Sequence, residues 1–428
     1  MTINIITLGC SKNLVDSEYL LRQFHTSGHE VFHDATEVNA DVVILNTCGF
    51  ILDAKEESIQ TILQYVDLKK KGLVRKVLVM GCLSERYRED LEREIPEVDG
   101  FFGVWDHAAI VKAVGAAYYP LLANDRLTTT PAHYAFLKIS EGCNRRCSFC
   151  AIPGIRGNQR SRSIEDLMDE AGNLLDRGAR ELILIAQDLT NYGVDLSGRR
   201  ELPRLLKKLA ALEGAEWIRL HYAYPTGFPD EVIDLMASMP NICNYLDIPI
   251  QHINDRVLDS MNRGHDRNKL EHLLYALRER VPGVAIRTTL LVGYPGETEK
   301  EFMELVDFVK KFRFDRLGVF PYSHEDDTPA AALQDDIPDK VKQERVAHIM
   351  SLQQEISLEL NTEKVGKHYR VLIDSEEADY YIGRTEYDAP EVDNEVLISK
   401  HEPAVVGSFA NVNITDADAF DLYGEIVR

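Results

Sequence analysis

The first part of the chain alternates between apolar runs and amphipathic stretches. The runs INIITLGC, DVVILNTCGF and KVLVMGCL are rich in Val, Ile and Leu, which is typical of buried strands. Helical patterns lie at residues 17–27 and 55–70. Because strands that alternate with helices form parallel sheets with right-handed crossovers, we predict a parallel α/β domain over residues 1–125.

The middle of the chain repeats this alternation six times. A polar stretch at residues 123–133 is typical of a linker, and a long amphipathic helix is predicted at 338–361. The six units predict a (βα)6 partial TIM barrel over residues 133–362, with its site at the carboxyl ends of the strands. The strand candidates begin at Phe136, Glu181, Trp217, Tyr245, Ala285 and Arg316, and the helical patterns lie at 163–177, 202–212, 229–239, 267–280 and 297–311.

From residue 364 the pattern changes to short runs in which apolar and polar residues alternate. HYRVLIDS, YYIGRTE, NEVLIS, FANVNITDA and DLYGEIV are separated by Gly, Asp and Pro turns. Such spacing predicts a small antiparallel, OB-like β-barrel of about five strands over residues 364–428. The whole chain is therefore predicted to be an α/β multidomain protein.

Three cysteines lie where predicted strands of the first domain end, namely Cys10, Cys48 and Cys82. The carboxyl ends of parallel strands face one edge of a sheet, and ligands bind along that edge. We therefore expect the three thiols to converge there. The alternative is that each cysteine is simply a small buried residue.

A second group, Cys143, Cys147 and Cys150, has the spacing Cys-x3-Cys-x2-Cys in the loop after the first barrel strand. A structural zinc site needs a fourth ligand, and a remote histidine such as His133 is the candidate in that alternative. Thiolates also bind iron–sulfur clusters, and three protein ligands on a four-iron cluster leave one iron open for a small molecule. We favour this second interpretation, and we expect the ring of Phe149 to pack against a flat organic group.

The chain is strongly acidic, with a formal net charge of −22 over 428 residues. This charge disfavours broad binding to nucleic acid and favours a basic partner. The sequence has no run of 18 apolar residues, and no basic segment followed by an apolar one opens it. We therefore expect a cytoplasmic protein with reduced thiols and no membrane partner.

The run from Cys143 to Cys150, with Ser148 and Phe149 before its last cysteine, closely resembles the signature of radical S-adenosylmethionine (SAM) enzymes. The segments TLGCSKNLVDSE, NTCGF and GCL resemble the N-terminal domain of the methylthiotransferases in that superfamily, and the terminal barrel resembles their TRAM domain. CAIPGIRGNQRSRS, LIAQDLTNYG, YLDIPIQHI and GVFPYSHEDDTPA are most similar to the branch that modifies an aspartate of ribosomal protein S-twelve.

This resemblance implies two 4Fe–4S clusters. The cluster on Cys143, Cys147 and Cys150 would bind SAM and, on reduction, release a 5′-deoxyadenosyl radical that removes hydrogen from the β-carbon of the aspartate. The cluster on Cys10, Cys48 and Cys82 would hold the sulfur to be inserted, and a second SAM would supply the methyl group. A reduced flavodoxin- or ferredoxin-type electron donor and a sulfur donor are the further partners implied.

Several other residues are candidate contacts. Gln187 and Gln251 end barrel strands, and Arg219 alternates with apolar residues, so the three are predicted, with Phe149, to bind SAM. Arg156, Arg160 and Arg162 form a basic group that we expect to bind the carboxylate of the target aspartate or of SAM. The alternative for these residues is strand-end capping or ion pairing with neighbours.

The substrate is predicted from the charge of the last segment. Residues 366–428 hold fourteen acidic and five basic residues, a net charge of −9. An acidic barrel attracts a basic ribosomal protein and repels free RNA, so tight RNA binding is not expected. The alternatives are a transfer-RNA adenosine methylthiotransferase and a non-catalytic iron–sulfur electron-transfer protein, although the latter would normally supply four cysteines to each cluster.

Overall fold

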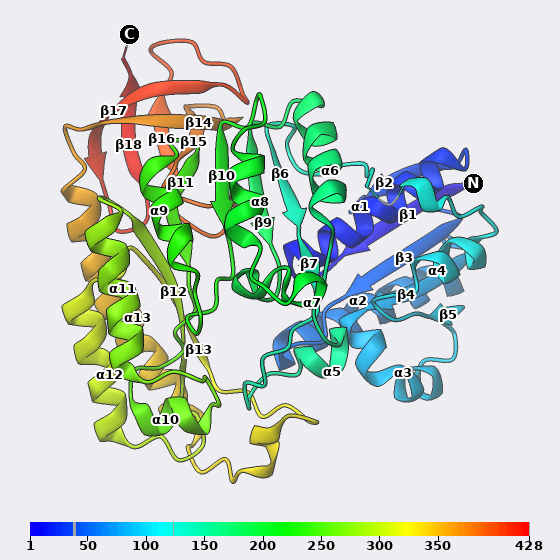
Figure 1. Ribbon diagram of the computed structural model, residues 1–428. Coiled ribbons are helices and arrows are strands. Elements are labelled where there is room, and N and C mark those ends of the chain that lie inside the picture. The colour runs from blue at the N-terminus through cyan, green and yellow to red at the C-terminus, as the bar shows by residue number, and fades with distance from the viewer. Residues whose placement is uncertain (37–39, 123, 428) are drawn as a thin grey trace.

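The computed structural model describes residues 1–36, 40–122 and 124–427, so Ala123 of the predicted linker and Arg428 of the predicted barrel lie outside the described residues. Figure 1 shows an N-terminal sheet at the right, a central set of strands flanked by helices, and a small barrel at the top near the C-terminus. This architecture confirms the predicted fold class. Among the residues described, no helix is both long and apolar enough to cross a bilayer.

The N-terminal sheet is parallel and has the strand order β2-β1-β3-β4-β5. Alternate residues of β3 face opposite layers: Val43 and Leu45 pack against α2 and α3, whereas Val42 and Ile44 pack against α1 and α4. The chain changes direction in the sheet between β1 and β3, and ligands bind at such switch points. The elements are β1 (Thr2–Thr7), α1 (Ser11–Thr26), β2 (Glu30–His33), β3 (Val42–Thr47), α2 (Leu52–Lys70), β4 (Lys76–Gly81), α3 (Cys82–Glu94), β5 (Gly100–Phe101), α4 (His107–Val114) and η1 (Pro120–Leu122).

The central sheet has six parallel strands in the order β13-β12-β11-β10-β9-β6, with each strand beside its neighbour in the sequence. Its core is formed by the strands and the helices that connect them. The elements are β6 (Tyr134–Lys138), β7 (Ser140–Glu141), α5 (Ile152–Arg156), β8 (Arg160–Ser161), α6 (Ile164–Asp176), β9 (Glu181–Ile185), η2 (Leu189–Asn191), α7 (Val194–Ser197), α8 (Leu202–Leu209), β10 (Trp217–Leu220), α9 (Asp230–Ser238), β11 (Ile242–Asp247), α10 (Asp255–Ser260), α11 (Arg267–Arg280), β12 (Ala285–Val292), α12 (Glu299–Phe312), β13 (Arg316–Pro321), η3 (Pro329–Ala332) and α13 (Asp339–Thr362).

The C-terminal strands close into a barrel in the order β14-β15-β16-β18-β17. The expected antiparallel pairing holds for all neighbours except β16 and β18, which run parallel. The predicted five-stranded barrel is therefore confirmed, and β17 closes it by pairing with β14. The strands are β14 (His368–Glu376), β15 (Tyr380–Thr385), β16 (Val396–Ser399), β17 (Phe409–Ala417) and β18 (Leu422–Ile426).

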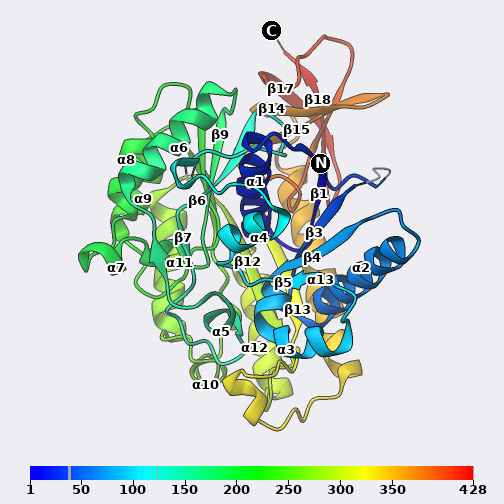
Figure 2. The same ribbon diagram turned by 90° about the vertical axis from the view of Figure 1, so that its right-hand side faces the viewer.

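The two outer parts cover opposite ends of the central strands. Leu372 and Phe409 of the C-terminal barrel pack against Trp217 and the buried Cys243, close to the amino ends of β10 and β11. In the N-terminal part, α1 lies beside β6 and packs on Tyr134 and Phe136 (Figure 2). The N-terminal part also reaches the other end of the strands, where Lys55 pairs with Glu325 at 2.7 Å. The carboxyl ends of the central strands, where a barrel site is expected, thus open toward the N-terminal sheet.

Candidate active site between two cysteine triads

One cavity of about 350 Å³ lies between the N-terminal sheet and the central strands. Its volume suits a small molecule, and both groups of three cysteines line it. We call Cys10, Cys48 and Cys82 the N-terminal triad and Cys143, Cys147 and Cys150 the central triad. The remaining lining residues are Lys12, Asn13, Phe50, Arg145, Phe149, Ile152, Arg156, Gln187, Tyr222, Ala223, Tyr224, Pro249, Gln251 and Arg263.

The N-terminal triad comes from three neighbouring strands. Cys10 is the N-cap of α1, Cys48 follows β3 directly, and Cys82 is the first residue of α3, directly after β4. Gly9 has a φ of +95°, and a Cβ added there would lie 2.8 Å from Cys48 Cβ. Only glycine therefore fits between the first two cysteines, and its absence of a side chain lets the two loops pack together.

The central triad lies in the loop that follows β7. Two backbone hydrogen bonds shape this loop, from Cys143 N to Gly157 O at 3.0 Å and from Cys150 N to Cys147 O at 3.1 Å. Gly142 has a φ of +80°, and a Cβ there would lie 2.4 Å from the backbone oxygen of Asn158. The loop is consequently held against the segment before β8, with its thiols toward the cavity.

The six cysteines of the cavity are donors of the kind that iron–sulfur clusters bind. No group of three or more Cys, His, Asp or Glu side chains converges tightly enough for one metal ion anywhere in the described ranges. In a four-iron cluster each thiolate binds a different iron, so the sulfurs lie further apart than around zinc. Burial raises the pKa of the Cys82 and Cys143 thiols to about 11 and that of Cys150 to about 12. Binding of metal must therefore displace protons from these thiols.

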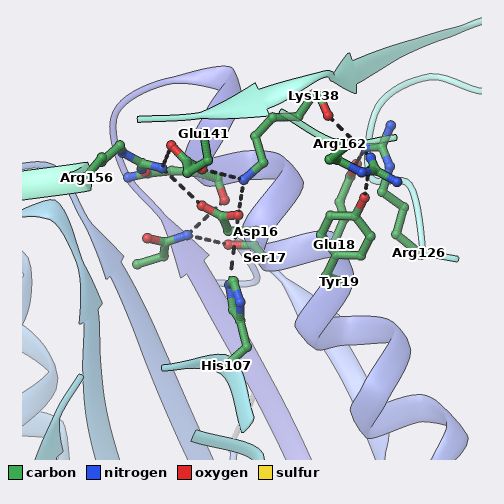
Figure 3. A network of polar contacts seen from close by, with 12 residues as sticks. Asp16, Ser17, Glu18, Tyr19, His107, Arg126, Lys138, Glu141, Arg156 and Arg162 are labelled. Carbon is green, nitrogen blue, oxygen red and sulfur yellow. Dashed lines mark hydrogen bonds and ion pairs between the residues drawn. The ribbon is translucent and has the colours of Figure 1, made fainter. Parts of the chain in front are cut away.

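A buried polar network joins α1 of the N-terminal part to Lys138, Glu141 and Arg156, which lie on either side of the central triad in the sequence (Figure 3). Arg156 donates from Nε to Cys82 Sγ at 3.3 Å and forms an ion pair with Glu141 at 2.8 Å. Lys138 binds both Glu141, at 2.8 Å, and Asp16 of α1. Burial alone would raise the pKa of the Glu141 carboxyl, but Lys138 and Arg156 hold that pKa well below its usual range. The negative charge of Glu141 therefore persists in the interior and holds Lys138 and Arg156, which both pair with Asp16 of the N-terminal part.

Three of the predicted cofactor contacts line the cavity, namely Phe149, Gln187 and Gln251. Gln187 donates from Nε2 to Glu141 Oε1 at 2.5 Å, and its own Oε1 is buried with no hydrogen-bond partner among the described residues. Gln251 has a φ of +69°, a left-handed conformation that is costly for a residue with a side chain. The unpartnered Oε1 of Gln187 and the left-handed backbone of Gln251 thus have no explanation in the surrounding described residues.

Arg219 lies elsewhere. It is fully buried and pairs with Glu181 at 2.6 Å, and Glu181 also binds Arg384 of the C-terminal barrel at 2.9 Å. Arg219 is not among the residues that line the cavity, and its contact with SAM stays a prediction. Alternation along β10 indicated which residues share a strand face, but not that this face is covered by the C-terminal barrel.

The three arginines predicted to bind a carboxylate, Arg156, Arg160 and Arg162, also lie in different places. Arg156 lines the cavity, but its charge is already paired with Glu141. Arg160 stacks on Trp105 at 4.6 Å, and Arg162 pairs with Glu170 at 2.5 Å, so these two do not reach the cavity. His133, the alternative zinc ligand, binds Asp374 of β14 at 2.8 Å and does not meet the central triad.

Sequence reasoning missed other lining residues. Arg145 and Arg263 lie on the ring of Tyr224 at 4.2 and 4.3 Å, and Arg263 Nη1 donates to Cys147 Sγ at 3.3 Å. Lys12 places its ammonium 3.0 Å from the ring centroid of Tyr222. Lys12 could have been noticed because it lies two residues after Cys10, whereas Arg263 is far from any cysteine in the sequence.

Family profiles match three successive parts of the chain. The radical SAM superfamily matches residues 137–309, the uncharacterized protein family UPF0004 matches residues 2–103, and the TRAM domain matches residues 365–427. A ribosomal protein uS12 methylthiotransferase of Cytophaga hutchinsonii is 55% identical over 100% of this chain and 98% of its own. Its counterpart in Flavobacterium johnsoniae is 57% identical over 99% of this chain and 97% of its own.

The chain belongs to the ribosomal protein uS12 methylthiotransferase family.

Among solved structures, the radical SAM methyltransferase TsrM of Kitasatospora setae superimposes on 82% of this chain and 90% of its own. The TM-score is 0.56 at 14% sequence identity, so the likeness concerns the fold alone. The uS12 methylthiotransferase family thus shares the arrangement of its central strands with a distant radical SAM enzyme.

Proposed function

We propose that this protein methylthiolates the β-carbon of an aspartate in ribosomal protein uS12, converting C–H to C–SCH3. The observation that carries the proposal is the pair of cysteine triads on one cavity. Full-length relatives at 55% and 57% identity, which carry the name of that activity, support the same reaction. The chain is accordingly a transferase of the radical SAM class.

The central triad is proposed to hold a 4Fe–4S cluster with one open iron, and the N-terminal triad a second such cluster. Bound together, these clusters and SAM supply a carbon radical, a sulfur atom and a methyl group. Phe149, Gln187 and Gln251 are proposed to contact SAM, because all three line the cavity beside the central triad. Arg156 is proposed to hold the Cys82 thiolate rather than a substrate carboxylate, since its guanidinium already faces that sulfur.

The chain's own residues orient the two triads and exclude water from the cavity between them. The Asp16, Lys138, Glu141 and Arg156 network fixes the two triads relative to one another. Fixed spacing matters because a radical on the aspartate β-carbon reacts with whatever it meets first, so the sulfur must be close when that radical forms. The closed C-terminal barrel packs on the amino ends of β10 and β11, whereas Tyr222, Pro249 and Gln251 of the cavity follow the carboxyl ends of these strands.

A protein substrate is favoured over transfer RNA by the charge of the C-terminal segment. That segment carries a net charge of −9, which attracts a basic ribosomal protein and repels phosphates. We further propose the domain limits 1–125, 133–362 and 364–428, a flavodoxin- or ferredoxin-type electron donor, and a separate sulfur donor. These partners supply the electrons and the sulfur that the reaction consumes.

The test is anaerobic incubation of the iron- and sulfide-reconstituted protein with SAM, a reductant and either purified uS12 or transfer RNA. We expect mass spectrometry to find one added methylthio group on an aspartate of uS12 and none on the RNA. Modification of the RNA alone would replace the protein substrate by the nucleic-acid alternative. Absence of 5′-deoxyadenosine from a fully loaded protein would instead favour the non-catalytic iron–sulfur protein.

A further inference from the structure

Lys12 is a buried cation without an anionic partner in the cavity. Its side chain is only 7% exposed, and its ammonium lies over the ring of Tyr222, 3.0 Å from the centroid. Within the part of the chain that the structure describes, no carboxylate lies within ion-pair distance of Lys12 and no hydrogen-bond acceptor meets its Nζ. Asp247 acts on this ammonium at longer range, and a buried ammonium in contact with an aromatic ring alone is costly for the fold, so it is expected to have another use.

The position of Lys12 in α1 adds to this cost. It lies in the first turn of a 16-residue helix, where the helix dipole disfavours positive charge, and that turn contains no acidic residue. The N-cap residue, Cys10, makes no side-chain capping bond. The amino end of α1 and the Lys12 ammonium therefore present positive potential to the cavity that both triads line.

The other cations of the cavity have partners. Arg156 pairs with Glu141, and Arg145 pairs with Asp188 at 2.8 Å. Arg263 lacks a carboxylate, but its two Nη atoms donate to Cys147 Sγ and to Pro249 O. Within the described ranges, Lys12 is thus the lining cation that donates to no protein atom at all, whereas Arg263 leaves only its buried Nε without a partner.

Resting on the proposed function, we infer that Lys12 binds the side-chain carboxylate of the target aspartate. A substrate carboxylate that enters this buried cavity needs a cation, because an unpaired buried charge costs several kcal/mol. The aspartate must also lie between the two triads, since its β-carbon has to be reached from both. Lys12 meets both conditions, because it follows Cys10 by two residues and contacts Tyr222, which comes from the carboxyl end of β10.

The pairing makes Lys12 a determinant of substrate specificity. A site that offers a cation to a carboxylate discriminates against the neutral amide, which leaves the ammonium unpaired. An enzyme with Lys12 should therefore prefer aspartate strongly over asparagine at the target position of uS12. An enzyme with an apolar residue of similar length should lose that preference.

The experiment compares Lys12→Met with the wild type on uS12 and on a uS12 variant with asparagine at the target position. We expect the wild type to prefer aspartate by about 100-fold or more in kcat/KM, and the preference to fall to within about tenfold in Lys12→Met. Lys12→Arg should retain a preference for aspartate, since it keeps the charge. Lys340→Met is the matched control, because Lys340 is 86% exposed on α13 and should keep the full preference.

Iron and sulfide contents are measured for each variant, because Lys12 lies close to Cys10. Binding of the two uS12 forms, followed by fluorescence anisotropy without SAM, gives the same comparison without turnover. An unchanged preference in Lys12→Met, or an equal loss on both substrates, overturns the inference. A weakened affinity for SAM with unchanged substrate preference overturns it too, by assigning Lys12 to the cofactor. If the wild type fails to modify uS12 at all, it is the proposed function that fails.

Discussion

The Nε atom of Arg156 lies 3.3 Å from the Sγ atom of Cys82, although 74 residues separate the two in the chain. The contact joins α5, next to the central triad, to the first residue of α3 in the N-terminal part. A guanidinium beside a thiol favours the thiolate: burial raises the pKa of Cys82, and Arg156 opposes that rise. One arginine thereby connects the loop of one triad to a thiol of the other.

Replacement of Arg156 by Gln should weaken iron binding at the N-terminal triad. Loss of a group that hydrogen-bonds a metal ligand typically lowers metal affinity by about 10- to 100-fold. The effect is measured in protein whose central triad has been changed to alanine, so that all bound iron belongs to the N-terminal triad. Arg160→Gln is the control, because Arg160 comes from the same region but stacks on Trp105. Equal iron retention in both variants would contradict this prediction.

Replacement of each triad by alanine should remove a different set of reaction products. Changing Cys10, Cys48 and Cys82 together to alanine should reduce bound iron by about half and abolish methylthiolation of uS12, while 5′-deoxyadenosine still forms. The same change at Cys143, Cys147 and Cys150 should abolish 5′-deoxyadenosine as well. Chromatography of the nucleoside and mass spectrometry of uS12 measure the two products. Methylthiolated uS12 from the first variant would show that the N-terminal triad is not needed for sulfur insertion.

Gly142→Ala should impair the central triad through its backbone. The residue has a φ of +80°, and the new Cβ would lie 2.4 Å from the backbone oxygen of Asn158. The left-handed conformation alone costs a residue with a side chain about 1–2 kcal/mol, and the clash adds to it. We expect a lower unfolding temperature and reduced iron loading, followed by circular dichroism and iron analysis. Gly154→Ala is the control, since no atom lies within 4 Å of a Cβ there; a loss of similar size in both would point to a general sensitivity of the loop.

Glu181→Gln should destabilise the protein without changing its affinity for SAM. Glu181 is fully buried between Arg219 and Arg384, and removal of its charge leaves two buried guanidinium groups without this partner. Breaking a buried ion pair typically costs about 3–5 kcal/mol of unfolding free energy. Glu216→Gln is the control, because the Glu216 side chain is 33% exposed and pairs with surface arginines. Thermal unfolding and equilibrium binding of SAM measure the two effects, and weaker SAM binding in Glu181→Gln would return Arg219 to the cofactor site.

Much of the fold was predictable because buried faces of strands and helices require apolar residues at regular spacing in the sequence. The six central strands and the helices that separate them follow directly from apolar periodicity, and the structure confirms them. Elements with little apolar content, such as β7 (Ser140–Glu141) and β8 (Arg160–Ser161), left no such pattern and were missed. The parallel pairing of β16 with β18 was also missed, since strand order depends on barrel closure and not on local sequence.

The sequence by itself determined the chemistry of the site: six cysteines in two groups of three, one compact in the chain and one placed after successive strands. Spacing and strand ends are local properties, so they can be read along the chain. Only the tertiary structure decided which charged residues reach the cavity. In the structure, Arg219 pairs with Glu181 and donates to Glu386 O of the C-terminal barrel, and Arg156 contacts Cys82. Among the described residues, Lys12 forms no ion pair. The reason is that an ion pair between distant segments is set by how the sheets pack, and neither hydrophobic periodicity nor motif spacing carries that information.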